Sequence, residues 1–287
     1  MDTEAAAADC EIARLPEDLL SEIVARTSPL DACRAAAVSP ALRAAADSDA
    51  VWSRFLPRSL PPLAGAPAPA PPSRKDLFLC LSDTPALLDG RLTSMWVDRE
   101  SGAKCYVLSA RSLHIARGDT PQHWRWIPLA DCSFSEAASL RAVCWLEIRG
   151  KIHSNMLSKN STYAAYLVFK IADRSYGLDS PAQEATVSIG ERESMRQVCV
   201  HDGEDDGDEE TVNHLPSTMT GTRRAVSSRN RPVLPQRRAD DWMELEMGDF
   251  YNEKGDDGEV CVSLMETKGG NWKKGLIVQG IEIRVKK

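Results

Sequence analysis

Two carboxylates with a spacing suited to chemistry occur in the segment WMELEM, where Glu244 and Glu246 lie two residues apart. On a β-strand both would point to the same face, as the acid and base of a glycosidase do. Three apolar residues alternate with them, which favours a solvated outer strand face instead. The chain contains no serine-hydrolase, zinc-protease, P-loop or dinucleotide-binding motif. The sequence therefore favours binding over catalysis and predicts a protein that is not an enzyme.

The eight cysteines give no support for a metal site or a disulfide framework. None forms a C-x-x-C pair, and no histidines lie at zinc-ligand spacing. The amino terminus is acidic and lacks the apolar stretch of a secretory signal, so reduced thiols in the cytosol or nucleus are expected. We expect no cofactor and no metal.

The amino-acid composition narrows the possible classes of protein further. The chain has 287 residues, 43% of them apolar, which is enough for one large or two modest domains. Its formal net charge of −7 argues against a protein whose main task is to grip nucleic-acid phosphates. No apolar run approaches the roughly 18–20 residues that a membrane span requires.

The amino-terminal segment has helical periodicity. Leu15, Leu19 and Ile23 recur at the i, i+4 spacing, and Leu20 and Val24 widen the apolar stripe. Ser-Pro pairs at positions 28–29 and 39–40 predict the starts of a second and a third short helix. About 45 residues of short helices cannot bury so many apolar side chains alone. The surplus predicts a surface that another polypeptide covers.

The rest of the chain shows period-2 alternation. Apolar residues alternate over 143–149, 163–171, 242–247 and 276–285, and the last of these predicts Ile277, Ile281, Ile283 and Val285 on one face. Repeated strands with Gly, Asp and Asn turns predict an antiparallel sandwich or barrel. A helix over about 74–88 is expected to lead into it.

Two stretches interrupt these patterns. Residues 57–72 hold seven of the 17 prolines and predict a semi-rigid spacer that keeps the helical unit away from the strands. An acidic block followed by the arginine-rich block Arg223–Arg238 predicts a disordered charged insertion at about 202–240. A solvated loop is favoured for the arginine-rich block, with a nuclear import signal or an anion patch as the alternatives.

The helical segment resembles an F-box, the three-helix unit that packs against the Skp adaptor of cullin-based ubiquitin ligases. The resemblance rests on the run LPEDLL at 15–20 together with Ile23, Pro29-Leu30, Cys33, Val38-Ser39 and Trp52. It implies that the following residues face or support the adaptor: Leu15, Pro16, Leu19, Leu20, Ile23, Leu30, Val38 and Trp52. The alternative is a self-contained helical cap in which Leu15 and Trp52 are core residues.

The strand-rich body resembles the phloem-lectin (Nictaba-like) domain that follows F-boxes in plants. The matching segments run in order along the body: 75–78, 88–90, 96–98, 101–106, 119–126, 145–152, 242–248, 257–260 and 272–278. The resemblance implies a β-sandwich that binds GlcNAc oligomers or N-glycan cores.

The resemblance implies that the sugar-contact residues of that family correspond here to Trp124, Glu259 and Glu266. The correspondence is only partial, because Arg117 occupies the position of a second family tryptophan. Seven residues of strand separate Glu259 from Glu266, so a straight strand would place them roughly 23 Å apart and on opposite faces. Core packing is an equal alternative for Trp124. Packing in the core or at the rim is favoured for Trp145, Trp242 and Trp272.

Together these patterns predict an α+β multidomain chain: a small three-helix F-box followed by an antiparallel, jelly-roll-like β-sandwich. The expected boundaries are a tail over 1–11, the F-box over 12–57, a Pro/Ala-rich linker over 58–73 and the lectin-like domain over 74–287. The expected function is substrate recognition in an SCF-type E3 ubiquitin ligase in the cytoplasm and nucleus. Its expected partners are a Skp-type adaptor, through it a cullin, and protein or glycoprotein clients, with no nucleic acid or membrane. A free carbohydrate-binding protein acting outside a ligase is the alternative.

Overall fold

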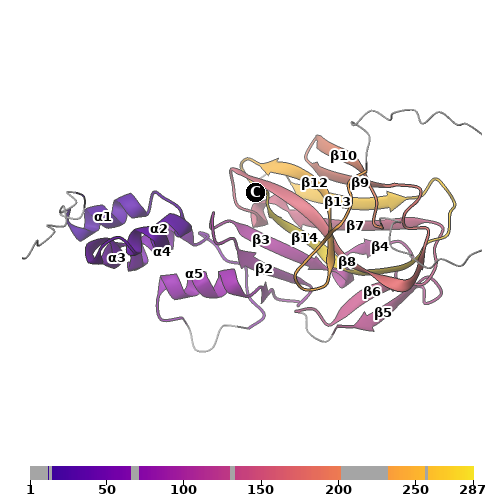
Figure 1. Cartoon of the computed structure of the whole chain (residues 1–287), viewed down its shortest axis with the longest axis horizontal. Helices are drawn as coiled ribbons and strands as arrows, with labels where there is room; N and C mark the ends of the chain where they lie inside the picture. The colour runs from indigo at the N-terminus through magenta and orange to yellow at the C-terminus, as the bar shows by residue number, and fades with distance from the viewer. Residues whose placement is uncertain (1–11, 13–14, 66–70, 130–132, 202–231, 256–257) are drawn as a thin grey trace, which may run out of the picture.

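A computed structural model of the chain describes residues 12, 15–65, 71–129, 133–201, 232–255 and 258–287. Helices and strands occupy opposite ends of an elongated molecule (Figure 1). The helices of the described residues are α1 (Glu17–Val24), α2 (Pro29–Ala36), α3 (Pro40–Asp47), α4 (Asp49–Phe55) and α5 (Arg74–Asp83). None of them is long and apolar enough to cross a membrane.

Serine caps start three of the helices. The hydroxyls of Ser28, Ser39 and Ser73 accept hydrogen bonds from backbone N–H groups three residues on, at the starts of α2, α3 and α5. Such caps satisfy N–H groups that have no partner inside the helix. The expected third helix is divided in two, because Ser48 has an extended conformation (φ −66°, ψ 142°) that ends α3 and starts α4.

The strands form two antiparallel sheets. One has nine strands with the central order β1-β2-β3-β14-β8-β12-β11, and β6, which carries β5, also pairs with β14. The other has five strands in the order β10-β9-β13-β7-β4. Their bounds are β1 (Ala86–Leu87), β2 (Thr93–Val97), β3 (Lys104–Ser109), β4 (His114–Ile115), β5 (Trp124–Pro128), β6 (Glu136–Leu140), β7 (Leu146–His153), β8 (Ser161–Tyr176), β9 (Gln183–Ile189), β10 (Arg192–Val198), β11 (Gln236–Arg237), β12 (Met243–Asn252), β13 (Glu259–Glu266) and β14 (Lys274–Val285).

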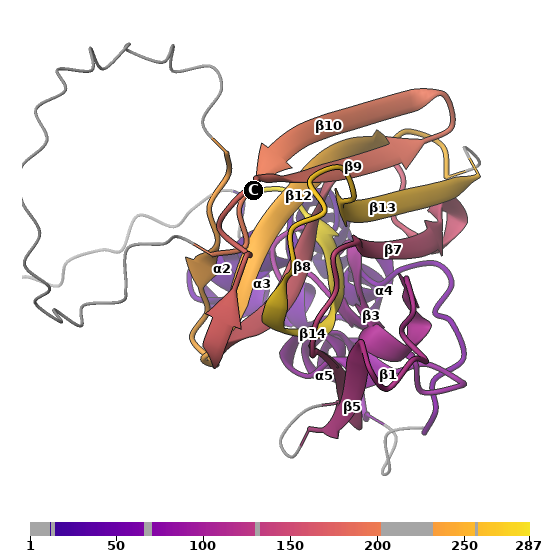
Figure 2. The same ribbon diagram turned by 90° about the vertical axis from the view of Figure 1, so that its right-hand side faces the viewer.

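The two sheets pack face to face and confirm the predicted β-sandwich. In Figure 2 the strands β9, β13 and β7 lie to the right of β12, β8 and β14. A Cβ on Gly150 of β7 would lie 3.0 Å from Ile281 of β14, so glycine permits the close approach of the sheets there. The core between the sheets contains Leu167, Phe169 and Leu245, as the alternation predicted.

Two further local expectations differ from the structure. The leading helix ends at Asp83 rather than near Leu88, because Pro85 favours the extended backbone seen at Thr84. The register of β14 shifts between Val278 and Gly280. This irregularity places Ile277 among residues outside the main core, whereas Ile281 and Ile283 belong to that core.

The proline-rich segment does not hold the helices away from the body, contrary to prediction. Leu63 bridges Leu88, and the Ala64 N–H donates to the Leu87 carbonyl, so the described part of the segment returns along β1. The Trp52 ring of α4 lies 5.1 Å from the Phe78 ring of α5, and α5 in turn packs against β2. Consequently α1–α5 and the sandwich share one continuous apolar core.

The described residues include the carboxy-terminal part of the predicted charged insertion. Residues 202–231, including most of the arginine-rich block, lie outside the described residues. Residues 232–240 are ordered, and the prediction of disorder is wrong for them. Val233 bridges Val198 of β10, and β11 pairs with β12.

Candidate functional site

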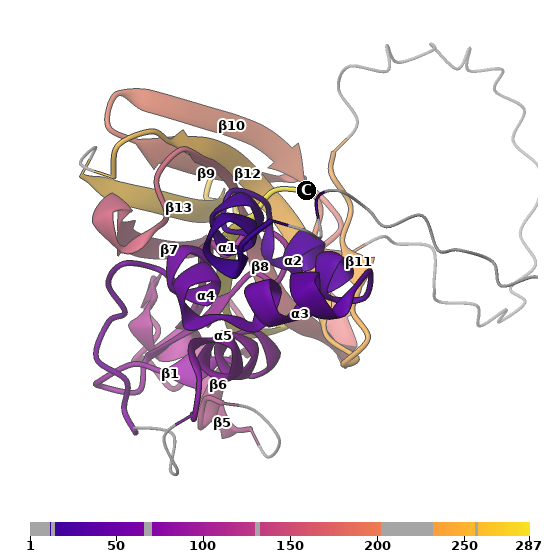
Figure 3. The same cartoon turned by 90° about the vertical axis from the view of Figure 1, so that its left-hand side faces the viewer.

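The first helix presents two apolar rows, and only one of them is covered. Leu20 is 1% exposed and Val24 is also buried within the helical unit. Leu19 is 52% exposed, and Leu15 and Ile23, one helical turn away on either side, are exposed as well. Figure 3 shows the end of the molecule where α1–α4 lie in front of the strands. We refer to Leu15, Leu19 and Ile23 as the α1 apolar row.

The other residues that were predicted to face or support the adaptor also divide into exposed and buried ones. Leu30 and Val38 are exposed apolar side chains, and Pro16 is also exposed at the start of α1. Trp52 is buried, and its Nε1 donates to the Ala46 carbonyl at 2.7 Å. Leu20 and Trp52 therefore support the helices that present the surface, and a direct contact role is left to the exposed residues.

The predicted sugar-contact residues are not brought together into one site. Trp124 is 2% exposed, belongs to the core, and donates from Nε1 to the Ala116 carbonyl. Glu259 and Glu266 occupy opposite ends of β13, where they pair with His153 and Leu146 of β7. Glu259 is exposed and Glu266 is buried, as their opposite parity predicted.

The two glutamates also differ in electrostatics. Glu259 forms a surface ion pair with Lys151 (2.9 Å), whose hydrogen bond lowers the pKa of Glu259. Glu266 pairs with the fully buried Lys273 and accepts from the Gly269 N–H. Burial alone would raise the pKa of Glu266, but the hydrogen bond and charge of Lys273, together with hydrogen bonds from the backbone N–H groups of Gly269 and Lys268, lower this pKa. Glu266 is thus part of a buried ion pair and is not free to accept from a sugar.

Exposed aromatic rings lie at the Glu266 end of the sandwich. Trp272 is 54% exposed, and Trp145 and Tyr176 are about equally exposed. The bridge between Val143 and Lys273 and the pairing of Lys274 with Tyr176 bring these three segments to one end of the sheets. The sequence interpretation placed Trp145 and Trp272 in the core or at the rim, and the structure places them at the rim. Their positions next to strand ends are the signal for exposure.

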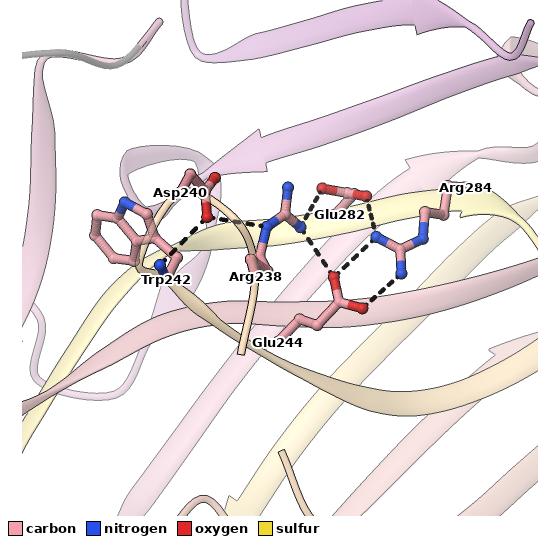
Figure 4. Close-up of polar contacts among 6 residues, drawn as sticks. All are labelled: Arg238, Asp240, Trp242, Glu244, Glu282 and Arg284. Atoms are coloured by element: carbon pink, nitrogen blue, oxygen red, sulfur yellow. Dashed lines mark hydrogen bonds and ion pairs between the residues drawn. The ribbon is translucent and has the colours of Figure 1, made fainter. Parts of the chain in front are cut away.

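The paired carboxylates of β12 are neutralised by arginines. Glu244 is bonded to Arg238 (3.1 Å) and Arg284 (2.7 Å), and Glu282 of β14 bonds the same two arginines (Figure 4). Glu246 pairs with Arg196 at 2.9 Å. Burial alone would raise the pKa of Glu244, but the hydrogen bonds and charges of Arg284 and Arg238 lower it. A general acid needs a raised pKa, so the glycosidase hypothesis has no support in this geometry.

The described residues hold no group of three or more His, Cys, Asp or Glu side chains placed to bind a metal ion. Six of the eight cysteines lie in the described part of the chain, and no disulfide joins them.

The fold and the α1 apolar row together define an F-box protein with a carboxy-terminal β-sandwich. Residues 12–54 match the F-box family, and residues 103–285, more than half of the chain, match the phloem protein 2 family. The chain therefore belongs to the F-box proteins that carry a phloem protein 2 domain.

Relatives in Arabidopsis thaliana share the whole arrangement. F-box protein PP2-B1 is 41% identical, with 94% of this chain and 88% of that protein covered. F-box protein PP2-B10 is 40% identical over 94% of this chain and 92% of its own length. F-box protein VBF is 34% identical over 95% of this chain and 99% of its own.

Proposed function

We propose that the protein is the substrate-recognition subunit of an SCF-type E3 ubiquitin ligase, acting in the cytoplasm and nucleus. The α1 apolar row carries the proposal, because it is an apolar helix face that the described residues leave uncovered within an F-box. Burying a Leu or Ile side chain contributes about 1.5–3 kcal/mol before ordering costs, so this row can hold a Skp-type adaptor. The chain itself then performs no chemistry and positions a client near the ligase's catalytic partner.

Co-purification with the Skp adaptor tests this proposal. The double variant Leu19→Asp, Ile23→Asp places two charges in the α1 apolar row without touching the covered row. We expect loss of adaptor binding by at least 100-fold, because each charge would be desolvated in the interface. Leu92→Asp, at an exposed apolar residue outside the helical unit, is the matched control and should bind normally. Full binding by the double variant would contradict the proposal.

We further propose that the body recruits clients through sugars such as GlcNAc oligomers or N-glycan cores. The exposed rings Trp145, Trp272 and Tyr176 support this, because an aromatic face covers the apolar C–H face of a pyranose. They replace Trp124, whose ring is buried, as the aromatic platforms of the proposal.

A glycan array with the full chain tests the sugar proposal. We expect binding of chitin oligomers that falls at least tenfold in Trp145→Ala, Trp272→Ala. Tyr251 is an exposed ring on β12 that pairs with Thr162, at the end of β8 opposite to Tyr176. Tyr251→Ala should therefore leave binding unchanged. A blank array would indicate recognition of protein features instead. Sugar binding by a chain that never associates with the adaptor would favour the free lectin.

A further inference from the structure

A cavity of about 840 Å³ lies where the helices meet the open end of the sandwich. The helical side contributes Pro29, Arg54 and Arg58, and the body contributes Lys104 and Lys159. A volume of this size is typical of small-molecule sites, which often form between domains. The cavity is separate from the α1 apolar row and from the exposed rings.

Lys104 is a buried lysine in the wall of this cavity. It is only 7% exposed, and its parity on β3 matches that of Tyr106, whose ring is in the core. Its backbone is held in place, since its N–H donates to Ser158 Oγ and its carbonyl accepts from Tyr163 Oη, both at 3.0 Å. Its ammonium group has no hydrogen bond or ion pair with any described residue. Burial lowers the pKa of Lys104, as expected for a charge removed from water without a partner.

The charges around the cavity are unbalanced. Arg58 and Lys159 also lack an acidic partner among the described residues. The one acidic side chain in the lining, Glu100, is bonded to Lys287 at 3.1 Å, and Arg54 is bonded to Glu22 at 3.4 Å. Three cationic groups, the buried Lys104 and the exposed Arg58 and Lys159, therefore have no acidic partner among the described residues, in a chain whose net charge is −7. Such a concentration of positive charge raises the local concentration of anions.

We propose that this cavity binds a small organic phosphate, with Lys104 at its base and Arg58 and Lys159 at its sides. A phosphate group offers the acceptor oxygens and the charge that the Lys104 ammonium and the Arg58 guanidinium lack here. Because the lining comes from both the F-box and the body, the bound anion links them and stabilises their packing. The site is independent of the proposed adaptor and sugar contacts.

Thermal unfolding of the full chain, with pyrophosphate as the probe and sodium chloride at matched ionic strength as the reference, tests the proposal. We expect pyrophosphate to raise the Tm by several degrees over chloride, with inorganic phosphate giving a smaller rise, because a ligand bound only to the folded state stabilises it. Lys104→Met should abolish the rise. Without the anion its Tm should equal or exceed that of the unmodified chain, because the substitution removes an unpaired charge from a largely buried side chain.

Two further variants keep the test decisive. Arg58→Gln, at a less buried position, should weaken the apparent affinity for pyrophosphate about tenfold, even if Lys104→Met fails to fold. Lys268→Gln, at an exposed lysine that pairs with Glu184, should keep the full response. Equal Tm values in pyrophosphate and chloride, or an undiminished response in both Lys104→Met and Arg58→Gln, would overturn the proposal.

Discussion

Glu266 and Glu259 are the same residue type on the same strand, but their surroundings give them different roles. Glu266 forms an ion pair with Lys273. Both groups are buried, and Lys273 Nζ also donates to the Asn271 carbonyl at 2.7 Å. Charges that leave water need close partners, and removing one partner leaves the other uncompensated. Glu266 therefore stabilises the junction of β13 with the loop before β14, whereas Glu259 is a surface residue.

Glu266→Gln and Glu259→Gln form a matched pair on one strand. At pH 7 we expect Glu266→Gln to lower the free energy of unfolding by about 3–5 kcal/mol, because Lys273 loses its counter-charge. Glu259→Gln should cause little change, because its ion pair with Lys151 is solvated. Chemical denaturation measures both, and equal effects would contradict the structural role of Glu266.

Among the elements, β12 and β14 are tied across the outer face of the nine-stranded sheet by charged side chains. Arg284 bonds Glu244 and Glu282, and its guanidinium also stacks on the Tyr166 ring, 3.8 Å from the centroid. β8 lies between the two strands, so these side chains span three neighbouring strands. The carboxylates that suggested catalysis therefore stabilise the sheet.

Arg284→Met tests this network through its pH dependence. We expect a loss of about 2–3 kcal/mol in unfolding free energy at pH 7. The folded-state pKa of Glu244 is lowered, so its contribution is present above its unfolded pKa, about 4.5, and is lost as the pH falls below it. The difference between the variant and the unmodified chain should shrink on acidification. Arg237→Met, beside an exposed Asp241, is the control and should change little. A difference that does not depend on pH would contradict the network.

For the molecule as a whole, the F-box and the sandwich are joined by packing as well as by the chain. Trp52 contacts Phe55 and Phe78, and a Cβ on Gly102 would lie 2.6 Å from the Phe55 carbonyl oxygen. Gly102 also has a φ of +72°, which glycine adopts readily. The proposed adaptor surface and the β-sandwich body therefore keep a defined relative position.

We expect one cooperative unfolding transition for the F-box and the body by calorimetry, because their core is continuous. Phe78→Ala should lower the midpoint of that single transition, with a cost of about 3–5 kcal/mol for the cavity it leaves. Two transitions, with only the smaller one shifted by Phe78→Ala, would show that the two parts unfold independently.

Local patterns were enough to predict short amino-terminal helices, several of the strands and an antiparallel sandwich or barrel, and the resemblance to a known family identified the F-box. Helical spacing identified α1, period-2 alternation identified β8 and β12, and the serine caps marked the starts of α2 and α3. These signals are local, because capping and side-chain periodicity depend on residues close together in the chain. The opposite faces of Glu259 and Glu266 followed from parity on one strand.

Contacts between distant segments settled the rest. Spacing showed one wide apolar stripe on α1, but which part of it is covered depends on α3 and α4. Trp124 is buried in a core that distant segments build together, and the proline-rich segment returns to β1 through the bridge between Leu63 and Leu88. The uncompensated Lys104 has no local signal either, because the residues around it include Pro29, 75 positions earlier in the chain, and Lys159, 55 positions later. Burial and charge pairing are sums over neighbours that only the folded chain brings together.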